Sequence, residues 1–267
     1  MPINNSHLKA RDFFNTTVKS YLQRSNEEVF SFSSLVFKRR NVIVEKFLEC
    51  IPSKGRVLDF GMGPGVFCKF CTKKGLFYLG LDISSKMVEE AKALELNNAE
   101  FEVGDIEALS KFNLSMDAVL AIGLIDYLEY PEHGIKSLAD CVKSNGYLIL
   151  SFRNRYSLPR YLRDWTKSIW RRLLDQKKYH SQKAFFSEIY EHSFDFSSQL
   201  KPLLIKLGFH QFEVSYFNCS PFFFNFPLHP LIFKKWYKWD LRFASKYFKR
   251  MCSGGVLICK KIADQKV

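Results

Sequence analysis

Three glycines, Gly61, Gly63 and Gly65, stand between a short apolar run at residues 56–60 and a segment with helical spacing. A turn of this kind, here called the glycine loop, lets a ligand approach the backbone closely, and N–H groups at a helix start favour a negative group. Asp82 ends the next apolar run, 19 residues after Gly63, where a carboxylate can accept both hydroxyls of a ribose. The pattern predicts a site for a nucleoside cofactor. The alternative is a tight strand-to-helix turn without a ligand.

A nicotinamide dinucleotide is one candidate for this site, but three features disfavour it. The dinucleotide fingerprint has a further glycine where this chain has Val66. Asp59 stands two residues before the first glycine, Asp105 follows the third predicted strand, and neither acid belongs to that fingerprint. A different cofactor accounts better for both acids.

The elements that must position these residues alternate regularly. Short apolar strands are predicted at 56–60, 77–81, 100–103, 118–122 and 147–152, with helices at about 85–94 and 131–142. Such alternation indicates βαβ crossovers, and hence an α/β fold whose parallel sheet is covered by helices on both faces. Helical spacing at 7–50 and 194–207 and further strands at 210–217 and 255–260 complete the pattern.

In this order, the segments resemble the motifs of class I S-adenosylmethionine-dependent methyltransferases. Residues 57–65 resemble the first motif, 80–84 the second, 104–106 the third, 121–124 the fourth and 145–151 the glycine-led fifth strand. The resemblance implies a doubly wound, Rossmann-like sheet of seven strands, mostly parallel with the last strand antiparallel. It also implies S-adenosylmethionine as the cofactor, without a metal. Its outline is closest to bacterial small-molecule O-methyltransferases.

The resemblance also implies how the chain is organised. Residues 1–54 would form an N-terminal helical cap and 55–153 the cofactor-binding core. Residues 154–267 would complete the fold and carry acceptor-side helical and aromatic insertions at about 155–193 and 218–253.

By the same resemblance, each residue of the cofactor site has an expected role. Asp59 and the glycine loop would hold the amino and carboxylate groups of the methionine part. Asp82 would bind the ribose hydroxyls and Asp105 the adenine amino group. Ile83 and Ile106 would lie on the two faces of the adenine ring.

Residues past the fourth predicted strand are expected near the reactive methyl group. Leu124 or Asp126 would face it, and Tyr21 would cap the cofactor or else pack in a helix–helix contact. Methyl transfer from a sulfonium is an in-line displacement, to which a base is added when the acceptor is a hydroxyl. His133 and Asp126 are the predicted bases, and a surface position at a helix start is the alternative for His133.

The acceptor side has fewer sequence signals. The Asn/Asp-Pro-Pro-aromatic run of base and amide N-methylation is absent at residues 124–127, which favours hydroxyls, carboxylates or small amines. Tyr127, Arg153 and Arg155 are predicted to bind the acceptor, because guanidinium groups match carboxylates and phosphates. The alternative for the two arginines is a solvated position after a strand.

Charge is distributed unevenly along the chain. The formal net charge is +13, and residues 151–267 hold 22 Lys and Arg against 8 Asp and Glu. This excess predicts a negatively charged partner, such as an anionic acceptor, an acidic carrier protein, nucleic acid or an anionic membrane.

A basic and aromatic segment follows the strand predicted at 210–217. Its cations recur every fourth residue with aromatic rings beside them: Lys234, Lys238, Arg242, Lys246 and Arg250, with Trp236, Trp239, Phe243 and Tyr247. The aromatic face is predicted to cover the acceptor pocket. Peripheral contact with an anionic membrane is the alternative, and binding of RNA is less favoured.

The seven cysteines are odd in number and scattered, which predicts reduced thiols in a cytoplasmic protein. Cys68 and Cys71 are predicted to pack in a helix rather than to bind zinc. No secretion signal is predicted, and prolines interrupt the longest apolar region at 217–233, so no spanning helix is predicted there.

Together these observations predict methyl transfer to an oxygen, a hydroxyl or carboxylate, of a small-molecule, glycan or lipid-linked biosynthetic intermediate. The alternatives are N-methylation of a small amine or RNA, and a non-catalytic module that binds the cofactor and acts at a membrane or RNA.

Overall fold

The computed structural model describes residues 5–25, 31–106, 109, 114–162, 164–165, 191–218, 229–244, 248 and 251–262. A seven-stranded sheet has the order β3-β2-β1-β4-β5-β7-β6. Its strands are β1 (Arg56–Phe60), β2 (Phe77–Asp82), β3 (Ala99–Val103), β4 (Met116–Ala121), β5 (Val142–Arg153), β6 (Phe209–Phe217) and β7 (Gly254–Lys261). Strands β1 to β5 run parallel, and β7 is antiparallel to both β5 and β6. The predicted fold class is confirmed.

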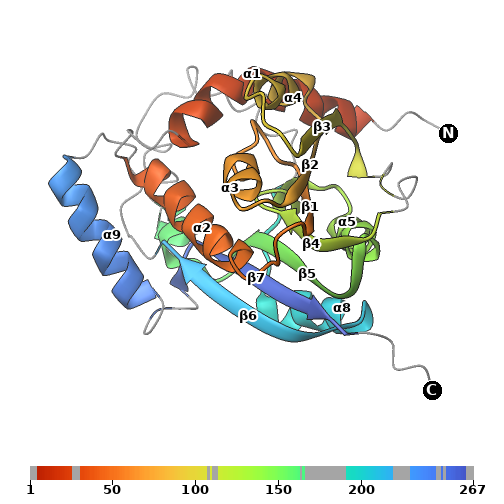
Figure 1. Cartoon of the computed structure of the whole chain (residues 1–267). Helices are drawn as coiled ribbons and strands as arrows, with labels where there is room; N and C mark the ends of the chain where they lie inside the picture. The colour runs from red at the N-terminus through yellow and green to blue at the C-terminus, as the bar shows by residue number, and fades with distance from the viewer. Residues whose placement is uncertain are drawn as a thin grey trace.

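Helices cover both faces of this sheet (Figure 1). They include α1 (Asn5–Ser25), α2 (Phe32–Leu48), α3 (Cys68–Lys73), α4 (Ser85–Lys92), α5 (Pro131–Asp140), α8 (Lys201–Lys206) and α9 (Pro230–Ala244). On one face, α2, α3 and α4 pack a core that includes Leu48 and Ala91. On the other face, α5 and α8 contribute Leu138 and Leu204. Because both faces are covered, only Arg56 of β1 is exposed.

The N-terminal segment, whose sequence is helical with a polar break, forms the two helices α1 and α2. Ser84, the residue that caps the start of α4, donates a hydroxyl hydrogen bond to Asn15 Oδ1 of α1 at 2.6 Å. The second helix begins after Ser31, whose hydroxyl accepts a hydrogen bond from Ser34 N at 3.2 Å. These contacts place α1 beside the carboxyl end of β2, where Ser84 follows the strand.

Two elements differ in detail from the sequence prediction. The helix predicted at 194–207 begins with a π-helical turn, η4 (Phe196–Leu200), and continues as α8. Pro202 has no N–H and cannot close a regular helical hydrogen bond to the preceding turn, which accounts for the wider turn. Strand β5 starts at Val142 because that residue pairs with Met116, ahead of a register shift in which the extra residues belong to β5.

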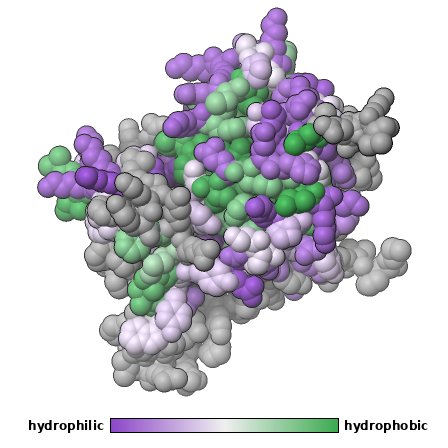
Figure 2. All heavy atoms as spheres, turned by 90° about the horizontal axis from the view of Figure 1, so that it is seen from below, coloured by the Kyte–Doolittle hydropathy of each residue, from purple (hydrophilic) through white to green (hydrophobic). Residues whose placement is uncertain are grey.

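Strand β6 forms one edge of the sheet. Figure 2 shows the molecule from below, the side on which β6 and α8 lie in Figure 1, and hydrophobic side chains gather in the middle of this face with hydrophilic ones around them. The strand itself exposes His210, Gln211 and Glu213. Polar side chains on an edge strand disfavour pairing with another chain.

Helix α9 packs on α2 and β6, at the left of Figure 1. Arg39 Nε lies 3.2 Å from Asp240 Oδ2, and the two side chains are only 5% and 1% exposed. The Arg39 guanidinium also lies 5.3 Å from the ring centroid of Tyr237, and Lys38 lies 5.0 Å from that of Phe233. A buried ion pair and two cation–ring contacts therefore hold α9 to α2.

The basic row predicted from the sequence lies partly in α9. Lys234, Lys238 and Arg242 are exposed, while Trp236 and Trp239 are half-buried and meet edge to face at 4.9 Å. Lys246, Tyr247 and Arg250 lie outside the described residues, and the side chain of Phe243 does as well. Within the part of the chain that is described, no helix is long and apolar enough to cross a membrane.

We expect Arg39→Ala to lower the free energy of unfolding by about 3 kcal/mol, because it leaves the Asp240 carboxylate buried without its cation. Urea denaturation measures this change. The matched control is Arg242→Ala on the exposed side of α9, which should stay within about 0.5 kcal/mol of the unmodified chain. Equal effects of the two substitutions would contradict a structural role of the buried pair.

Candidate functional site

The glycine loop follows β1 and meets the end of β2. Gly61, Gly63 and Gly65 have φ angles of 73°, 58° and 77°, a region that L side chains rarely adopt. Gly63 N donates a hydrogen bond to Asp82 Oδ2 at 2.8 Å, and Ser84 N donates one to Asp82 Oδ1 at 2.9 Å. Burial raises the pKa of Asp82, while these two hydrogen bonds lower it. The glycine loop and Asp82, on which the prediction of a nucleoside cofactor rests, are thus hydrogen-bonded to each other.

Asp59 lies at the carboxyl end of β1 and is buried. The Tyr78 hydroxyl donates a hydrogen bond to Asp59 Oδ2 at 2.6 Å. Burial raises the pKa of Asp59 to about 7, against the opposing effect of the Tyr78 hydrogen bond. This carboxyl group can therefore change its charge near neutral pH.

Two side chains cover the glycine loop. A Cβ atom built on Gly61 would lie 3.1 Å from Leu124 Cδ1, and one built on Gly63 would lie 3.3 Å from Tyr21 Cε1. Tyr21 belongs to α1, and Leu124 follows β4. Both predicted cofactor neighbours therefore lie against the loop, and a side chain on Gly61 or Gly63 would require Leu124 or Tyr21 to shift.

The predicted adenine-side residues lie near the ends of β2 and β3. Ile83 and Asp105 are half-buried, whereas Ile106 is 6% exposed and belongs to the core that α5 covers. Their contacts with an adenine ring stay a prediction.

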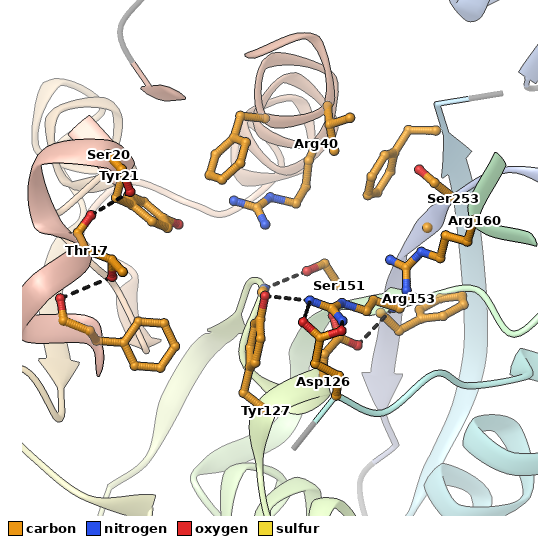
Figure 3. A pocket seen from close by; sticks show the side chains of 18 of the residues that line it. Thr17, Ser20, Tyr21, Arg40, Asp126, Tyr127, Ser151, Arg153, Arg160 and Ser253 are labelled. Carbon is orange, nitrogen blue, oxygen red and sulfur yellow. Dashed lines mark hydrogen bonds and ion pairs between the residues drawn. The ribbon is translucent and has the colours of Figure 1, made fainter. Parts of the chain in front are cut away.

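A cavity of about 640 Å³ lies between α1, α2 and the ends of β4, β5, β6 and β7 (Figure 3). This volume suits a small molecule. Its apolar wall is largely aromatic and is made by Phe13, Phe14, Tyr21, Val36, Phe37, Phe152 and Phe217. Its polar groups are Thr17, Ser20, Arg40, Asp126, Tyr127, Ser151, Arg153, Arg160, Glu191 and Ser253, and Gly123 and Gly254 contribute backbone. Tyr21 belongs both to this wall and to the cover of the glycine loop.

A network of charged groups lines one side of the cavity. Asp126 Oδ1 accepts a hydrogen bond from Arg153 N at 2.9 Å, and Asp126 Oδ2 lies 3.6 Å from Arg153 Nε. The Arg153 guanidinium also donates to the Tyr127 hydroxyl at 2.6 Å and pairs with Glu191 at 2.7 Å. Burial raises the pKa of Asp126 to about 6, although the hydrogen bond and charge of Arg153 lower it. Asp126 is therefore mostly ionised at neutral pH and close to the range of a general base.

The structure brings Asp126, Tyr127 and Arg153 together, but two other predicted residues lie elsewhere. His133 is exposed in the first turn of α5, and Arg155 is exposed in the turn after β5. Neither lines the cavity. Both residues occupy the exposed positions that were predicted as the alternatives to a role in the site.

Sequence reasoning missed Arg40, which points into the cavity from α2 (Figure 3). A signal was present, because Arg40 stands four residues from both Val36 and Val44 on the inward, apolar face of its helix. A cation on such a face is unusual. Glu191, an acid of the same cavity lining, was missed as well.

Cysteine chemistry departs from the prediction at one position. Cys50, Cys68, Cys71, Cys141 and Cys259 are free, and burial raises the pKa of Cys68 to about 11. Cys252, however, is disulfide-bonded, so the prediction of seven reduced thiols is wrong there. Among the described residues, no group of three or more His, Cys, Asp and Glu could hold a metal ion.

A family model described as a methyltransferase domain matches residues 36–209. Over 120 residues the chain is 31% identical to the ubiquinone biosynthesis O-methyltransferase of Coxiella burnetii, which covers 43% of this chain and 51% of that protein. Over 166 residues it is 29% identical to the mitochondrial ubiquinone biosynthesis O-methyltransferase of Schizosaccharomyces pombe, covering 57% of each. The chain therefore spans little more than half the length of these curated relatives.

The fold is also similar to solved structures. The crystal structure of magnesium protoporphyrin IX methyltransferase from Synechocystis PCC 6803 with bound SAH has a TM-score of 0.61 and 19% identity. The match covers 94% of this chain and 98% of that chain. At this identity the likeness shows the fold.

The raised pKa of Asp59 predicts a pH effect on stability. Its folded-state pKa of about 7 exceeds the usual 3.8, so the stability that its protonated form contributes is complete below the usual value and lost as pH rises through about 7. Asp59→Asn keeps an acceptor for Tyr78 and cannot ionise. From roughly pH 4 to pH 8, the unfolding free energy of this variant minus that of the unmodified chain should rise by about 4 kcal/mol.

Urea denaturation across this pH range measures the difference. The exposed Asp140→Asn serves as the matched control and should show a difference that is flat with pH. A flat difference for Asp59→Asn as well would show that Asp59 titrates normally.

Proposed function

Because the chain belongs to the methyltransferase domain family, we propose that it transfers a methyl group from S-adenosylmethionine to an oxygen of a small acceptor. The observation that carries this proposal is a shared boundary. Tyr21 lies against Gly63 of the glycine loop and also lines the 640 Å³ cavity, so a donor on the loop and an acceptor in the cavity would be neighbours.

The residues at the strand ends fit the cofactor. A carboxylate offers about four lone-pair positions. Asp82 uses one on each oxygen for Gly63 and Ser84, which leaves a position on each for the two ribose hydroxyls. Ionised Asp59 would attract the amino group of the methionine part, which the glycine loop would also hold. Leu124 and Tyr21 would exclude water from the loop.

Oxygen is the favoured acceptor atom for two reasons. The curated relatives are O-methyltransferases by name. Asp126 lies in the cavity wall with a pKa raised by burial to about 6, so it can accept the proton of an acceptor hydroxyl at neutral pH. Bound S-adenosylmethionine would supply an electrophilic methyl group. Arg153 would keep the Asp126 carboxylate oriented during the proton transfer, and a carboxylate acceptor would need no base.

The acceptor itself is proposed to be a small-molecule, glycan or lipid-linked intermediate with negative charge. The charged groups of the cavity lining are three arginines and two acids, so positive groups outnumber negative ones: Arg40, Arg153 and Arg160 against Asp126 and Glu191. Such a lining favours an anionic ligand.

We also propose that α9 makes a peripheral contact with anionic lipid. Lys234, Lys238 and Arg242 are exposed along it, and Leu231 and Ile232 at its start are 64% and 49% exposed. Apolar side chains at one end and cations along the helix suit a membrane interface. None of the described α9 residues lines the cavity, and the predicted cover over the acceptor pocket stays a prediction.

The cofactor assignment predicts that S-adenosylmethionine binds in calorimetry and that Asp82→Ala weakens its affinity by about 10- to 100-fold, through loss of charged hydrogen bonds to the ribose. The exposed Asp140→Ala is the matched control and should bind as the unmodified chain does. Circular dichroism checks folding, and Asp82→Asn provides a milder second variant. Absence of binding at about 100 μM, or unchanged affinity in both Asp82 variants, would overturn the assignment.

The lipid contact predicts flotation with vesicles of phosphatidylserine and phosphatidylcholine at low salt, and release as salt is added. Replacing Lys234, Lys238 and Arg242 of α9 by Gln should strongly reduce flotation, since each contributes about 1 kcal/mol near an anionic surface. The matched control removes three exposed lysines of α3 and α4, Lys69, Lys73 and Lys92. Equal losses in both triple variants would indicate nonspecific attraction by net charge.

A further inference from the structure

We propose that Arg40 forms an anion subsite in the cavity and that it binds a carboxylate or phosphate group of the acceptor. The inference rests on the proposed function in one respect only, namely that the cavity holds the methyl acceptor. The subsite itself follows from the surroundings of Arg40.

Arg40 stands at the junction between the cavity and the cofactor loop. Its guanidinium points from α2 into the cavity (Figure 3). A Cβ atom built on Gly123 would lie only 2.8 Å from Arg40 Nη1, so the guanidinium rests against the backbone after β4. The next residue, Leu124, covers Gly61 of the glycine loop. An anion on Arg40 would therefore lie close to the predicted position of the methyl donor.

The guanidinium of Arg40 is held in place but is in ion-pair contact with no carboxylate among the described residues, although its charge lowers the pKa of Asp59 and of Asp126. Its carbon lies 4.8 Å from the ring centroid of Phe37, which fixes the plane of the group. Arg40 Nε is buried without a hydrogen-bond partner, and no ion pair to Arg40 occurs within the described structure. A buried donor without a partner costs free energy, which a bound anion would recover.

The other arginines near Arg40 are already paired. Arg39, the preceding residue, forms the buried ion pair with Asp240 of α9. Arg153 contacts both acids of the cavity, Asp126 and Glu191. The predicted acceptor clamp at Arg153 is therefore engaged by the protein itself, and Arg40 takes the position of anion binder.

The chemistry of the cavity defines the class of ligand. Phe13, Phe14 and Phe37 offer rings to an apolar or aromatic body, and Arg40 offers a planar fork of donors to a carboxylate or phosphate. The cofactor's own carboxylate is the second source of such an anion. The experiment has to separate the two sources.

Calorimetry with phenyl phosphate and phenol provides the test, because the two ligands share a ring and differ in the anion. We expect phenyl phosphate to bind the unmodified chain, and its dissociation constant to rise at least ~10-fold in Arg40→Gln, as for loss of a charged hydrogen bond. Arg40→Lys keeps the charge but loses the planar pair of donors. Its dissociation constant for phenyl phosphate should lie between those of the unmodified chain and Arg40→Gln. The matched control Arg56→Gln, an exposed arginine at the amino end of β1 that does not line the cavity, should leave the constant unchanged.

The cofactor is titrated into the same variants. Retained affinity for S-adenosylmethionine in Arg40→Gln, with lost affinity for phenyl phosphate, supports the acceptor subsite. Lost cofactor affinity together with competition between the two ligands assigns the anion to the cofactor and overturns the proposal. Unchanged phenyl phosphate binding in both Arg40 variants overturns it as well.

The two proposals can fail separately. If the unmodified chain does not bind S-adenosylmethionine but binds phenyl phosphate through Arg40, the anion subsite stands and the proposed methyl transfer fails. Should Arg40→Gln not fold, the comparison of Arg40→Lys with Arg56→Gln decides the matter, because an unchanged constant in Arg40→Lys then overturns the subsite.

Discussion

The two oxygens of the Asp82 carboxylate hold the cofactor side of the molecule together. One accepts the N–H of Gly63 at 2.8 Å and the other accepts that of Ser84 at 2.9 Å, so one side chain fixes both the glycine loop and the start of α4. The neighbouring strand packs closely on the loop, because a side chain at Gly80 would displace the Met62 side chain. The loop is thus preformed around a carboxylate that still has acceptor positions for a ligand.

The second constraint comes from α2, in which two adjacent residues make contacts on different sides of the helix. Neighbours on a helix point about 100° apart. Arg39 therefore reaches Asp240 and fastens α9, while Arg40 turns into the cavity. The same helix buries Val44 and Leu48 against the sheet. Support for α9, the wall of the cavity and the cover of the sheet consequently depend on one element.

The fold was largely predictable because its signals are local. Strand β1, the glycine loop and Asp82 lie within 27 residues, and each strand is marked by an apolar run. The antiparallel β7 came from the resemblance, since alternation of elements does not give strand direction. The turn before α8 was missed because Pro202 alters hydrogen bonding without altering the apolar spacing.

The site was less predictable, because its partners are distant in sequence. Asp126 and Arg153 are in contact although they are 27 positions apart in the sequence. The sequence around Arg153 gives no sign that its charge is paired within the protein. For His133, the surface position predicted as the alternative is the observed one, because Gly134, Ile135 and Leu138 define the buried face of α5 and His133 stands off it. Helical position was the stronger guide for both His133 and Arg40, whereas residue type alone favoured the histidine.

Electrostatics links the two halves of the site through Arg40. Burial is the main cause that raises the pKa of Asp59 and Asp126, and the charge of Arg40 lowers the pKa of both. An anion bound to Arg40 would offset that charge, so the pKa of Asp126 would rise further toward neutral. A base whose pKa lies nearer the working pH transfers protons more effectively. The anion that positions an acceptor would then also strengthen the base that activates it, and an acceptor without the anion would lose both effects together.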